Sequence, residues 1–176
     1  MLISRLPEIT FHTRVRDTSI PGDNPFRWQD KTTKEIFGGR RSILFSLPAA
    51  FSPTCTDRHV PRYEELADQF NAYGVDQIIC VAVNDAFVMF QWGKKIGTNQ
   101  VLLLPDGNAE FTRRMGMLVD RSVFGMGMRS WRYSLLLNGL EIETAFVEEG
   151  IDSQIPGDPL KVSDADTMLA HLQSMP

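Results

Sequence analysis

Short runs of apolar residues, each of strand length, recur along the chain between stretches of mixed polarity. They read SILFSL, VDQIICVAV and VLLLPD. A nearly continuous apolar run of this length is typical of a strand covered on both faces. Near the N-terminus, ITFHTRV instead alternates apolar and polar side chains, which predicts a half-buried strand. RYSLLL, the Asn138-Gly139 pair and EIETAFVE predict a hairpin, because Asn-Gly fits a type I′ turn.

Helical periodicity fills most of the space between these strands. From Thr54 to Tyr73 apolar residues recur three or four apart, and Gly74 follows where a left-handed cap belongs. Pro61 lies inside this helix and predicts a kink, because it removes one hydrogen bond. Three further helices are predicted for AFVMFQWGKKIG, NAEFTRRMG and VSDADTMLAHLQ, with Asn84 or Asp85 capping the first and Ser163 capping the last.

The order of these elements predicts an α/β fold. Strands connected by helices and followed by an antiparallel hairpin indicate a mixed central sheet with helices on both faces. The chain of 176 residues contains no internal repeat and no linker. We therefore expect a single domain over residues 1–176.

Composition narrows the function classes. The net charge is -4 and no Lys/Arg run occurs, which argues against nucleic-acid binding. No window approaches the roughly 18 apolar residues of a membrane span, and the N-terminal segment lacks a signal-peptide core. The two cysteines are too few for a disulfide scaffold and lack metal-ligand spacing, so we expect no metal or cofactor. A cytoplasmic, reducing setting follows as the expectation.

Cys55 stands out by its position in SLPAAFSPTCTDRHVP, directly after an apolar strand. Pro53 suits an early helical position, which places Cys55 in the first turn of the helix. The positive end of the helix dipole and its free N–H groups favour a thiolate there. The alternative is a small apolar filler, the commoner role of cysteine. The polar residues and prolines around Cys55 favour a reactive thiol.

Several cysteine chemistries do not fit the spacing around this thiol. A phosphatase signature requires an arginine six positions after the cysteine, where this chain has Pro61. A thioredoxin-type dithiol requires a second cysteine three positions on, where Arg58 stands. His59 lies one helical turn away, but no cysteine-protease signature accompanies it.

One pattern does fit: Pro48-x-x-x-Ser52-x-x-Cys55 resembles the active-site motif of the peroxiredoxins. PAAFSPTCTDRHVP, VAVNDAFVMFQWGKK and SWRYSLLLNG are similar to the subgroup called type five in animals and type II in plants. PGDPLKVSDADTML is similar to bacterial members in which a glutaredoxin domain can follow. The resemblance runs from about Pro21 to the C-terminus. It implies a thioredoxin-like fold and reduction of hydrogen peroxide and alkyl hydroperoxides.

The resemblance also implies a role for each residue of the motif. Cys55 is the attacking thiolate, which becomes a sulfenic acid. The hydroxyl of Ser52 bonds the sulfur and the peroxide oxygen, although the family more often has threonine there. Pro48 shields the sulfur from water. Arg132 matches the arginine that precedes the hairpin and would stabilise charge on sulfur and oxygen.

Two further residues have weaker support in the sequence. His59 matches a histidine that the subgroup tends to keep, and a structural role is as consistent with the sequence as a catalytic one. Arg129, in the glycine-rich loop FGMGMRS, is a candidate for supporting the same site. A second hypothesis also stays open: the protein is a peroxide sensor or holdase on the same fold, and Cys55 is its redox reporter. The presence of Pro48, Ser52 and Arg132 together favours a peroxidase that turns over rather than a sensor.

Cys80 is the other thiol, in the apolar run IICVAV. We expect it to be buried and inert in a central strand, too confined to meet Cys55 in a disulfide. Regeneration by glutathione, glutaredoxin or both follows as the expectation, with thioredoxin as an open alternative. Phe51, Phe87 and Phe124 are large apolar residues at loop or helix-start positions. Together with the resemblance they predict a homodimer, and the alternative is that all three are core residues.

Overall fold

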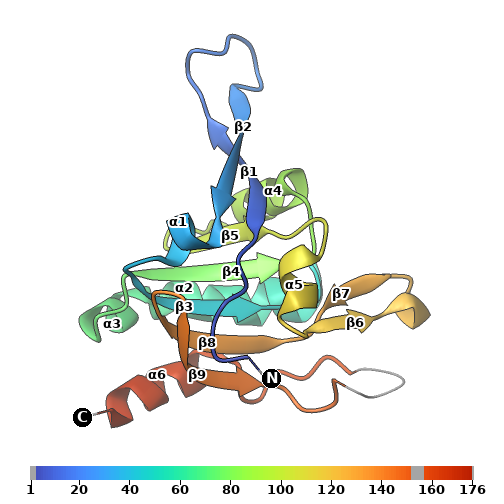
Figure 1. Ribbon diagram of the computed structural model, residues 1–176. Helices are drawn as coiled ribbons and strands as arrows, with labels where there is room; N and C mark the ends of the chain where they lie inside the picture. The colour runs from blue at the N-terminus through green and yellow to red at the C-terminus, as the bar shows by residue number, and fades with distance from the viewer. Residues whose placement is uncertain (1–2, 152–156, 176) are drawn as a thin grey trace.

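A mixed sheet forms the centre of the molecule in the computed structural model, which describes residues 3–151 and 157–175. Within these residues its five strands have the spatial order β5-β4-β3-β8-β9 (Figure 1). Their bounds are β3 (Arg41–Ser46), β4 (Gln77–Ala82), β5 (Val101–Pro105), β8 (Tyr133–Asn138) and β9 (Glu141–Val147). β3, β4 and β5 are parallel, and β8 runs antiparallel to both β3 and β9. The predicted mixed sheet and hairpin are confirmed.

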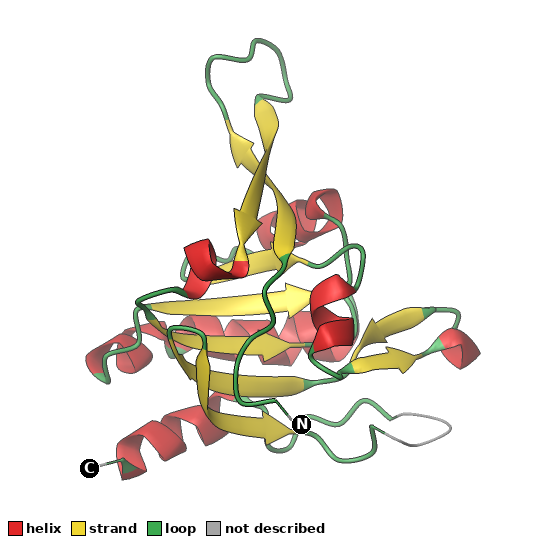
Figure 2. Ribbon diagram, in the orientation of Figure 1, coloured by secondary structure: helices red, strands yellow, loops and turns green. Residues whose placement is uncertain are grey.

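Helices cover both faces of this sheet (Figure 2). One face packs against α2 (Val60–Glu65), α3 (Ala67–Ala72), α4 (Ala86–Ile96) and α6 (Ala165–Ser174). The other face packs against α1 (Thr33–Phe37), α5 (Glu110–Arg114) and the N-terminal segment. The runs SILFSL and VDQIICVAV are thus central strands that are buried on both sides, as their composition predicts. The third run, VLLLPD, forms the edge strand β5, in which Leu102 is exposed.

Alternation along the strands decides which side chains reach which face. In β3, Ile43 and Phe45 belong to the core under α2, α3, α4 and α6, whereas Leu44 belongs to the opposite core. In β8, Leu136 lies on the first side, and Leu135 and Leu137 lie on the second. This period of two also decides which residues beside β8 reach the core under α2, α3, α4 and α6.

Two small sheets and a short helix lie outside the central layer. β1 (Thr10–Arg16) and β2 (Phe26–Thr32) form a hairpin that projects away from the central sheet (Figure 1). β6 (Leu118–Asp120) pairs with β7 (Met128–Ser130), and a 3₁₀ turn, η2 (Ser122–Phe124), follows β6. The sequence predicted β1 but not β2, α1, β6 or β7. The side chains of β2 are mostly exposed, so FRWQDKT shows no apolar alternation.

The long helix predicted over 54–73 is divided into three parts. It opens with a π turn, η1 (Cys55–His59), continues as α2, and is interrupted at Leu66 before α3 begins. The N–H of Val60 bonds to the carbonyl of Cys55, five residues back. This widened turn lies directly before Pro61, which has no N–H to donate. The disturbance expected at Pro61 is therefore a π turn, and the break at Leu66 was not predicted.

The predicted caps are partly confirmed. Gly74 has a φ of 78°, the left-handed conformation that was expected. Asp85 caps α4 and accepts hydrogen bonds from the N–H groups of Phe87 and Val88. Ser163 is not the N-cap of α6; Asp164 is, and it accepts from the N–H of Thr167 at 2.9 Å. The register of the helix start differs by one residue because the Ser163 hydroxyl bonds to Glu148 instead.

Candidate active site

The loop between β3 and η1 brings the predicted motif to the end of the sheet. Pro48 is buried in this loop, and the N–H of Ala50 donates to the side-chain oxygen of Asn84 at 3.0 Å. Phe51 has a φ of 64°, a left-handed conformation that is rare for a residue with a side chain. Backbone strain of this kind costs on the order of 1–3 kcal/mol and persists where surrounding contacts hold it. The loop is thus tied to the rest of the fold immediately before Ser52.

Cys55 and Arg132 meet at the buried end of this loop. Nη1 and Nη2 of Arg132 each lie 3.5 Å from Sγ of Cys55. The exposed fractions of the two residues are 0% and 1%. Burial opposes the charge of Arg132, but the nearby Cys55 and Asp158 outweigh it and raise the pKa of the guanidinium. Arg132 therefore presents a permanent positive charge to the sulfur, from 77 residues away in the chain.

The position of Arg132 follows from the alternation in β8. Arg132 lies directly before the strand and four positions before Leu136, an even spacing that directs both side chains to the same face. Leu136 faces the core that contains Cys55. Its neighbours Trp131 and Tyr133 face the opposite core. The predicted hairpin therefore directs Arg132, and not the adjacent aromatic residues, toward the sulfur.

His59 lies in the same cluster, and its two ring nitrogens have different partners. Nε2 lies 3.1 Å from the carbonyl oxygen of Ser163, and Nδ1 lies 2.9 Å from Nη1 of Arg132. A carbonyl oxygen only accepts and a guanidinium only donates, so Nε2 carries the proton and Nδ1 accepts from Arg132. Burial, and then the charge of Arg132, lowers the pKa of His59 to about 3. His59 is therefore a neutral ring that orients the guanidinium.

The side chains of Ser52 and Arg129 bond to backbone carbonyl groups. The hydroxyl of Ser52 donates to the carbonyl of Ala49 at 3.0 Å, and the carbonyl of Ser52 accepts from the N–H of Thr56 at 2.9 Å. Arg129 donates to the carbonyls of Met126 and Val83 at 2.8 Å and 2.6 Å. Among the described residues, neither Ser52 Oγ nor the Arg129 guanidinium bonds to Sγ of Cys55.

Sequence reasoning did not identify Asp158, which bonds to the same guanidinium. Its carboxylate accepts from Nη2 of Arg132 in an ion pair. Arg121, buried nearby, donates from Nη2 to the carbonyl of Gly157 at 2.9 Å. The turn residues of PGDPLKVS predict a loop, but no spacing rule relates a loop carboxylate to an arginine 26 residues earlier. Only the fold brings the two together.

Cys80 occupies β4 and is completely buried, as predicted. It lies opposite Phe45 on one neighbouring strand and Leu103 on the other. Burial raises the pKa of its thiol well above the ordinary value, and the nearby Cys55 adds to the rise. Cys80 is therefore held as a neutral thiol.

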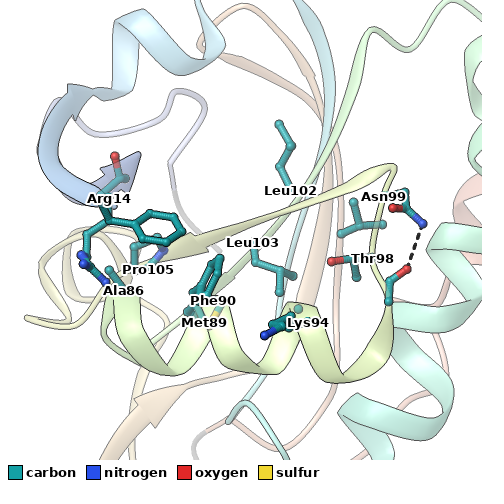
Figure 3. A pocket seen from close by; sticks show the side chains of 15 residues that line it. Arg14, Ala86, Met89, Phe90, Lys94, Thr98, Asn99, Leu102, Leu103 and Pro105 are labelled. Carbon is teal, nitrogen blue, oxygen red and sulfur yellow. Dashed lines mark hydrogen bonds between the residues drawn. The ribbon is translucent and has the colours of Figure 1, made fainter. Parts of the chain in front are cut away.

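A separate pocket of about 560 Å³ lies between α4, β5 and the β1–β2 hairpin (Figure 3). Its lining is largely apolar and includes Met89 and Phe90 from α4 and Leu103 from β5, together with the charged Arg14 and Lys94. It contains no cysteine or histidine and none of the residues that surround Cys55.

No helix in residues 3–151 or 157–175 is long and apolar enough to cross a membrane. In the same part of the chain, no three or more His, Cys, Asp or Glu side chains are grouped so that they could hold a metal ion.

Comparison with known proteins identifies the family. The Redoxin family model matches residues 26–169. A peroxiredoxin of Synechocystis sp. is 61% identical over 173 residues, which cover 98% of this chain and 92% of that protein. The hybrid peroxiredoxin hyPrx5 of Haemophilus influenzae is 48% identical over 168 residues, covering 96% of this chain and 64% of that protein. The chain belongs to the peroxiredoxin family.

A solved structure supports the same assignment at the level of the fold. The Plasmodium falciparum antioxidant protein, described as a 1-Cys peroxiredoxin, matches with a TM-score of 0.89 at 32% identity, over 97% of this chain and 98% of that one. The peroxiredoxin described here therefore has the thioredoxin-like redoxin fold. It belongs to the type II, or type five, subgroup, close to the peroxiredoxin domain of the hybrid proteins, as the sequence resemblance predicted.

A peroxiredoxin is a thiol peroxidase, and its chemistry sets three requirements for the site. A thiolate attacks one oxygen of a peroxide and becomes a sulfenic acid, while the second oxygen leaves and takes a proton to form water or an alcohol. The site must therefore hold a thiolate, exclude bulk water and stabilise negative charge as it moves from sulfur to oxygen. In this peroxiredoxin, Cys55, Arg132 and His59 form a buried cluster in which a thiol lies beside a guanidinium.

Proposed function

We propose that Cys55 is the thiolate that attacks the peroxide and that Arg132 stabilises both the sulfur and the departing oxygen. The observation that carries this proposal is the approach of both terminal nitrogens of Arg132 to Sγ of Cys55, at 3.5 Å each. A guanidinium fork donates along two directions at once, so it can bond the sulfur and a peroxide oxygen together. As the O–O bond breaks, the charge that leaves the sulfur stays beside the same cation.

The other motif residues have supporting roles in this proposal. The hydroxyl of Ser52, one turn before Cys55, rotates from the Ala49 carbonyl to bond the peroxide when substrate enters. Pro48 contributes a buried apolar ring that keeps water from the sulfur. His59 fixes the orientation of Arg132 through its unprotonated nitrogen. Arg129 supports the loop that precedes β8 through its bonds to backbone carbonyls.

The proposed reductant is glutathione, acting alone or with a glutaredoxin. Cys80 is confined to the middle of the sheet, and the chain has no other thiol. One glutathione thiolate attacks the sulfenic sulfur and forms a mixed disulfide, and the hydroxide that leaves takes up the proton released by the glutathione thiol to form water. A second thiol then attacks the glutathione sulfur, which releases oxidised glutathione or a glutaredoxin mixed disulfide and returns Cys55 as a thiolate. The 1-Cys description of the Plasmodium relative supports this cycle.

Peroxide consumption with three electron donors tests the cycle. Hydrogen peroxide and an alkyl hydroperoxide are supplied to the wild type and to Cys80→Ser, with glutathione, with glutathione plus glutaredoxin, or with thioredoxin and its reductase. We expect turnover of both peroxides with the glutathione donors and a single glutathione adduct, on Cys55, in the mass spectrum. Turnover with thioredoxin alone would contradict the glutathione cycle, and a Cys55–Cys80 disulfide would contradict one-cysteine chemistry. Oxidation without turnover under every donor would favour a peroxide sensor.

We also propose that the protein acts as a homodimer of single-domain chains in the cytoplasm. Phe51, Phe87 and Phe124 are 47%, 50% and 51% exposed, although large apolar side chains are usually covered. A second copy of the chain would cover them. Analytical ultracentrifugation of the wild type should show a dimer at micromolar concentration, and Phe124→Asp should shift it toward monomer. A wild type that sediments only as a monomer would contradict this part of the proposal.

A further inference from the structure

The carboxylate of Asp158 occupies a distinctive place in the cluster around Cys55. It bonds to Nη2 of Arg132, the same nitrogen that lies 3.5 Å from Sγ of Cys55. The side chain of Arg132 is 1% exposed, whereas that of Asp158 is 37% exposed. Asp158 is thus the partner of Arg132 that faces solvent, and its negative charge lies beside the cation on the solvent side.

The segment that carries Asp158 is held firmly on its C-terminal side. Oε1 of the buried Glu148 accepts from the N–H groups of Lys161, Val162 and Ser163, at 2.8, 2.9 and 2.9 Å, and from the Ser163 hydroxyl at 2.8 Å. Burial opposes the charge of Glu148, but these bonds outweigh it and lower the pKa of the carboxyl. Glu148 is therefore an ionised acceptor that fixes the backbone of this segment.

The same segment is also fixed to the active-site helix and to the β6–η2 region. The carbonyl of Ser163 accepts from His59 and from the hydroxyl of Tyr63, at 3.1 and 3.0 Å. The carbonyl of Gly157, next to Asp158, accepts from Arg121. Asp158 lies between these anchors. Its carboxylate is therefore positioned by the fold and not by the ion pair alone.

From this geometry we propose that Asp158 is a specificity-determining residue that sets the charge at the entrance to the site and so selects neutral peroxides over anionic ones. A peroxide that approaches Arg132 meets the carboxylate of Asp158 before the buried thiolate. A neutral hydroperoxide meets little electrostatic opposition there, whereas a hydroperoxide that carries a carboxylate is repelled by Asp158. The proposal rests on the proposed roles of Cys55 and Arg132.

A charge-matched pair of substrates tests the proposal. The probes are a short-chain tertiary hydroperoxy acid, ionised at neutral pH, and its methyl ester, which have the same O–O group. The measured quantity is the ratio of the second-order rate constants for oxidation of Cys55 by the acid and by the ester. In Asp158→Asn this ratio should rise about tenfold at low salt and less at high salt, because the repulsion is screened. Asp158→Glu keeps the charge and should keep the ratio of the wild type.

A matched control separates a local effect from a general change of net charge. Asp57→Asn removes the same charge from an exposed position of the active-site helix, so it should leave the ratio within about twofold of the wild type. An unchanged ratio in Asp158→Asn, or an equal rise in Asp57→Asn, would overturn the proposal. A rise in Asp158→Glu equal to that in Asp158→Asn would also overturn it, because the effect would then come from packing. If Cys55→Ser still consumed either probe, the assignment of Cys55 would fail instead.

Discussion

The two cysteines of this peroxiredoxin have the same degree of burial and opposite chemical surroundings. Cys55 and Cys80 are each 0% exposed, and both belong to the core beneath α2, α3, α4 and α6. Cys55 lies in a π turn within reach of the Arg132 guanidinium, whereas Cys80 lies in a central strand between Phe45 and Leu103. Burial alone therefore does not distinguish the two thiols.

The two thiols differ in the charged group beside them and in the backbone that carries them. Removing water disfavours a thiolate at both positions, since a buried anion loses its hydration. At Cys55 two charged hydrogen-bond donors replace that hydration. At Cys80 the strand's N–H groups are engaged in the sheet, and burial raises the pKa of the thiol. The same core thus contains one thiol in contact with a guanidinium and one thiol packed within a strand.

Replacing the two thiols one at a time should give the largest contrast. Cys55→Ser should abolish peroxide reduction, because a serine hydroxyl is not ionised at neutral pH and is a poor nucleophile. Cys80→Ser should keep the second-order rate constant with hydrogen peroxide within about twofold of the wild type, since its thiol is not ionised. Stopped-flow oxidation measures both. A Cys80→Ser protein with native circular dichroism and no peroxide reactivity would contradict the contrast.

Removing the charge that distinguishes Cys55 should have the next largest effect. Arg132→Ala should slow oxidation by about 10²–10³-fold, the usual loss when a charge-stabilising donor is removed. Arg132→Lys should recover part of this loss, because it restores the charge without the two-pronged geometry. Arg113→Ala removes an equal charge from an exposed position in α5 and serves as the control. A near-normal rate in Arg132→Ala would exclude the guanidinium from the chemistry.

Disturbing the orientation of the Arg132 guanidinium should slow the oxidation of Cys55 less than removing the guanidinium does. His59→Ala deletes the acceptor for Nη1 of Arg132, and we expect oxidation about tenfold slower, the equivalent of one buried hydrogen bond left unmade. His59→Asn should slow oxidation less, because its amide can restore one of the two hydrogen bonds that the ring makes, to Arg132 or to the Ser163 carbonyl. Rates for both variants are compared with those for Cys80→Ser. Equal rates in His59→Ala and the wild type would show that Arg132 is oriented without the ring.

The remaining prediction concerns stability in acid, not the rate of oxidation. His59 has a pKa of about 3 in the folded protein and an ordinary value of 6.5 when unfolded, so the unfolded chain binds the extra proton between these values. The free energy of unfolding should therefore fall as the pH falls from 6.5 toward 3, with a slope of up to about 1.4 kcal/mol per pH unit from this group.

Urea unfolding at several pH values between about 7 and 4 measures this slope. His59→Asn should reduce the slope, because the titrating ring is absent. His12→Gln, which replaces an exposed histidine of the β1–β2 hairpin, is the control and should keep the full slope. A wild-type slope in His59→Asn would contradict the assignment of the buried ring as its source.

Much of the fold was predictable because its central strands are buried on both faces. A run such as VDQIICVAV has few structural alternatives to a buried strand. The two residues Asn138-Gly139 are enough to predict the hairpin. β2 and the β6–β7 pair were missed because short or exposed strands carry little apolar periodicity. The π turn was missed for a different reason. Its hydrogen bonds differ from those of an α-helix by one residue, which does not change the spacing of apolar side chains.

The residues of the candidate site also divide into those that could be predicted from the sequence and those that could not. Cys55 and Ser52 lie in one short motif and Arg132 lies next to a predictable hairpin, so the resemblance to the peroxiredoxins could assign a role to each of them. Asp158 and the role of Glu148 depend on how the segment 157–163 crosses the active-site helix, and no local pattern encodes that crossing. Residues contributed by loops from distant parts of the chain are found only when the backbone path is known.

The alternation in β8 has a consequence for how this chain tolerates insertions and deletions. Arg132 and the core-facing Leu136 are four residues apart, with Trp131 and Tyr133 directed into the opposite core. Loss or gain of one residue between Arg132 and Leu136 would exchange these faces and offer an aromatic side chain to the sulfur. A change of two residues would keep the faces but move the guanidinium by about one strand repeat, or roughly 6–7 Å. The spacing from Arg132 to the hairpin is therefore a fixed length in this protein.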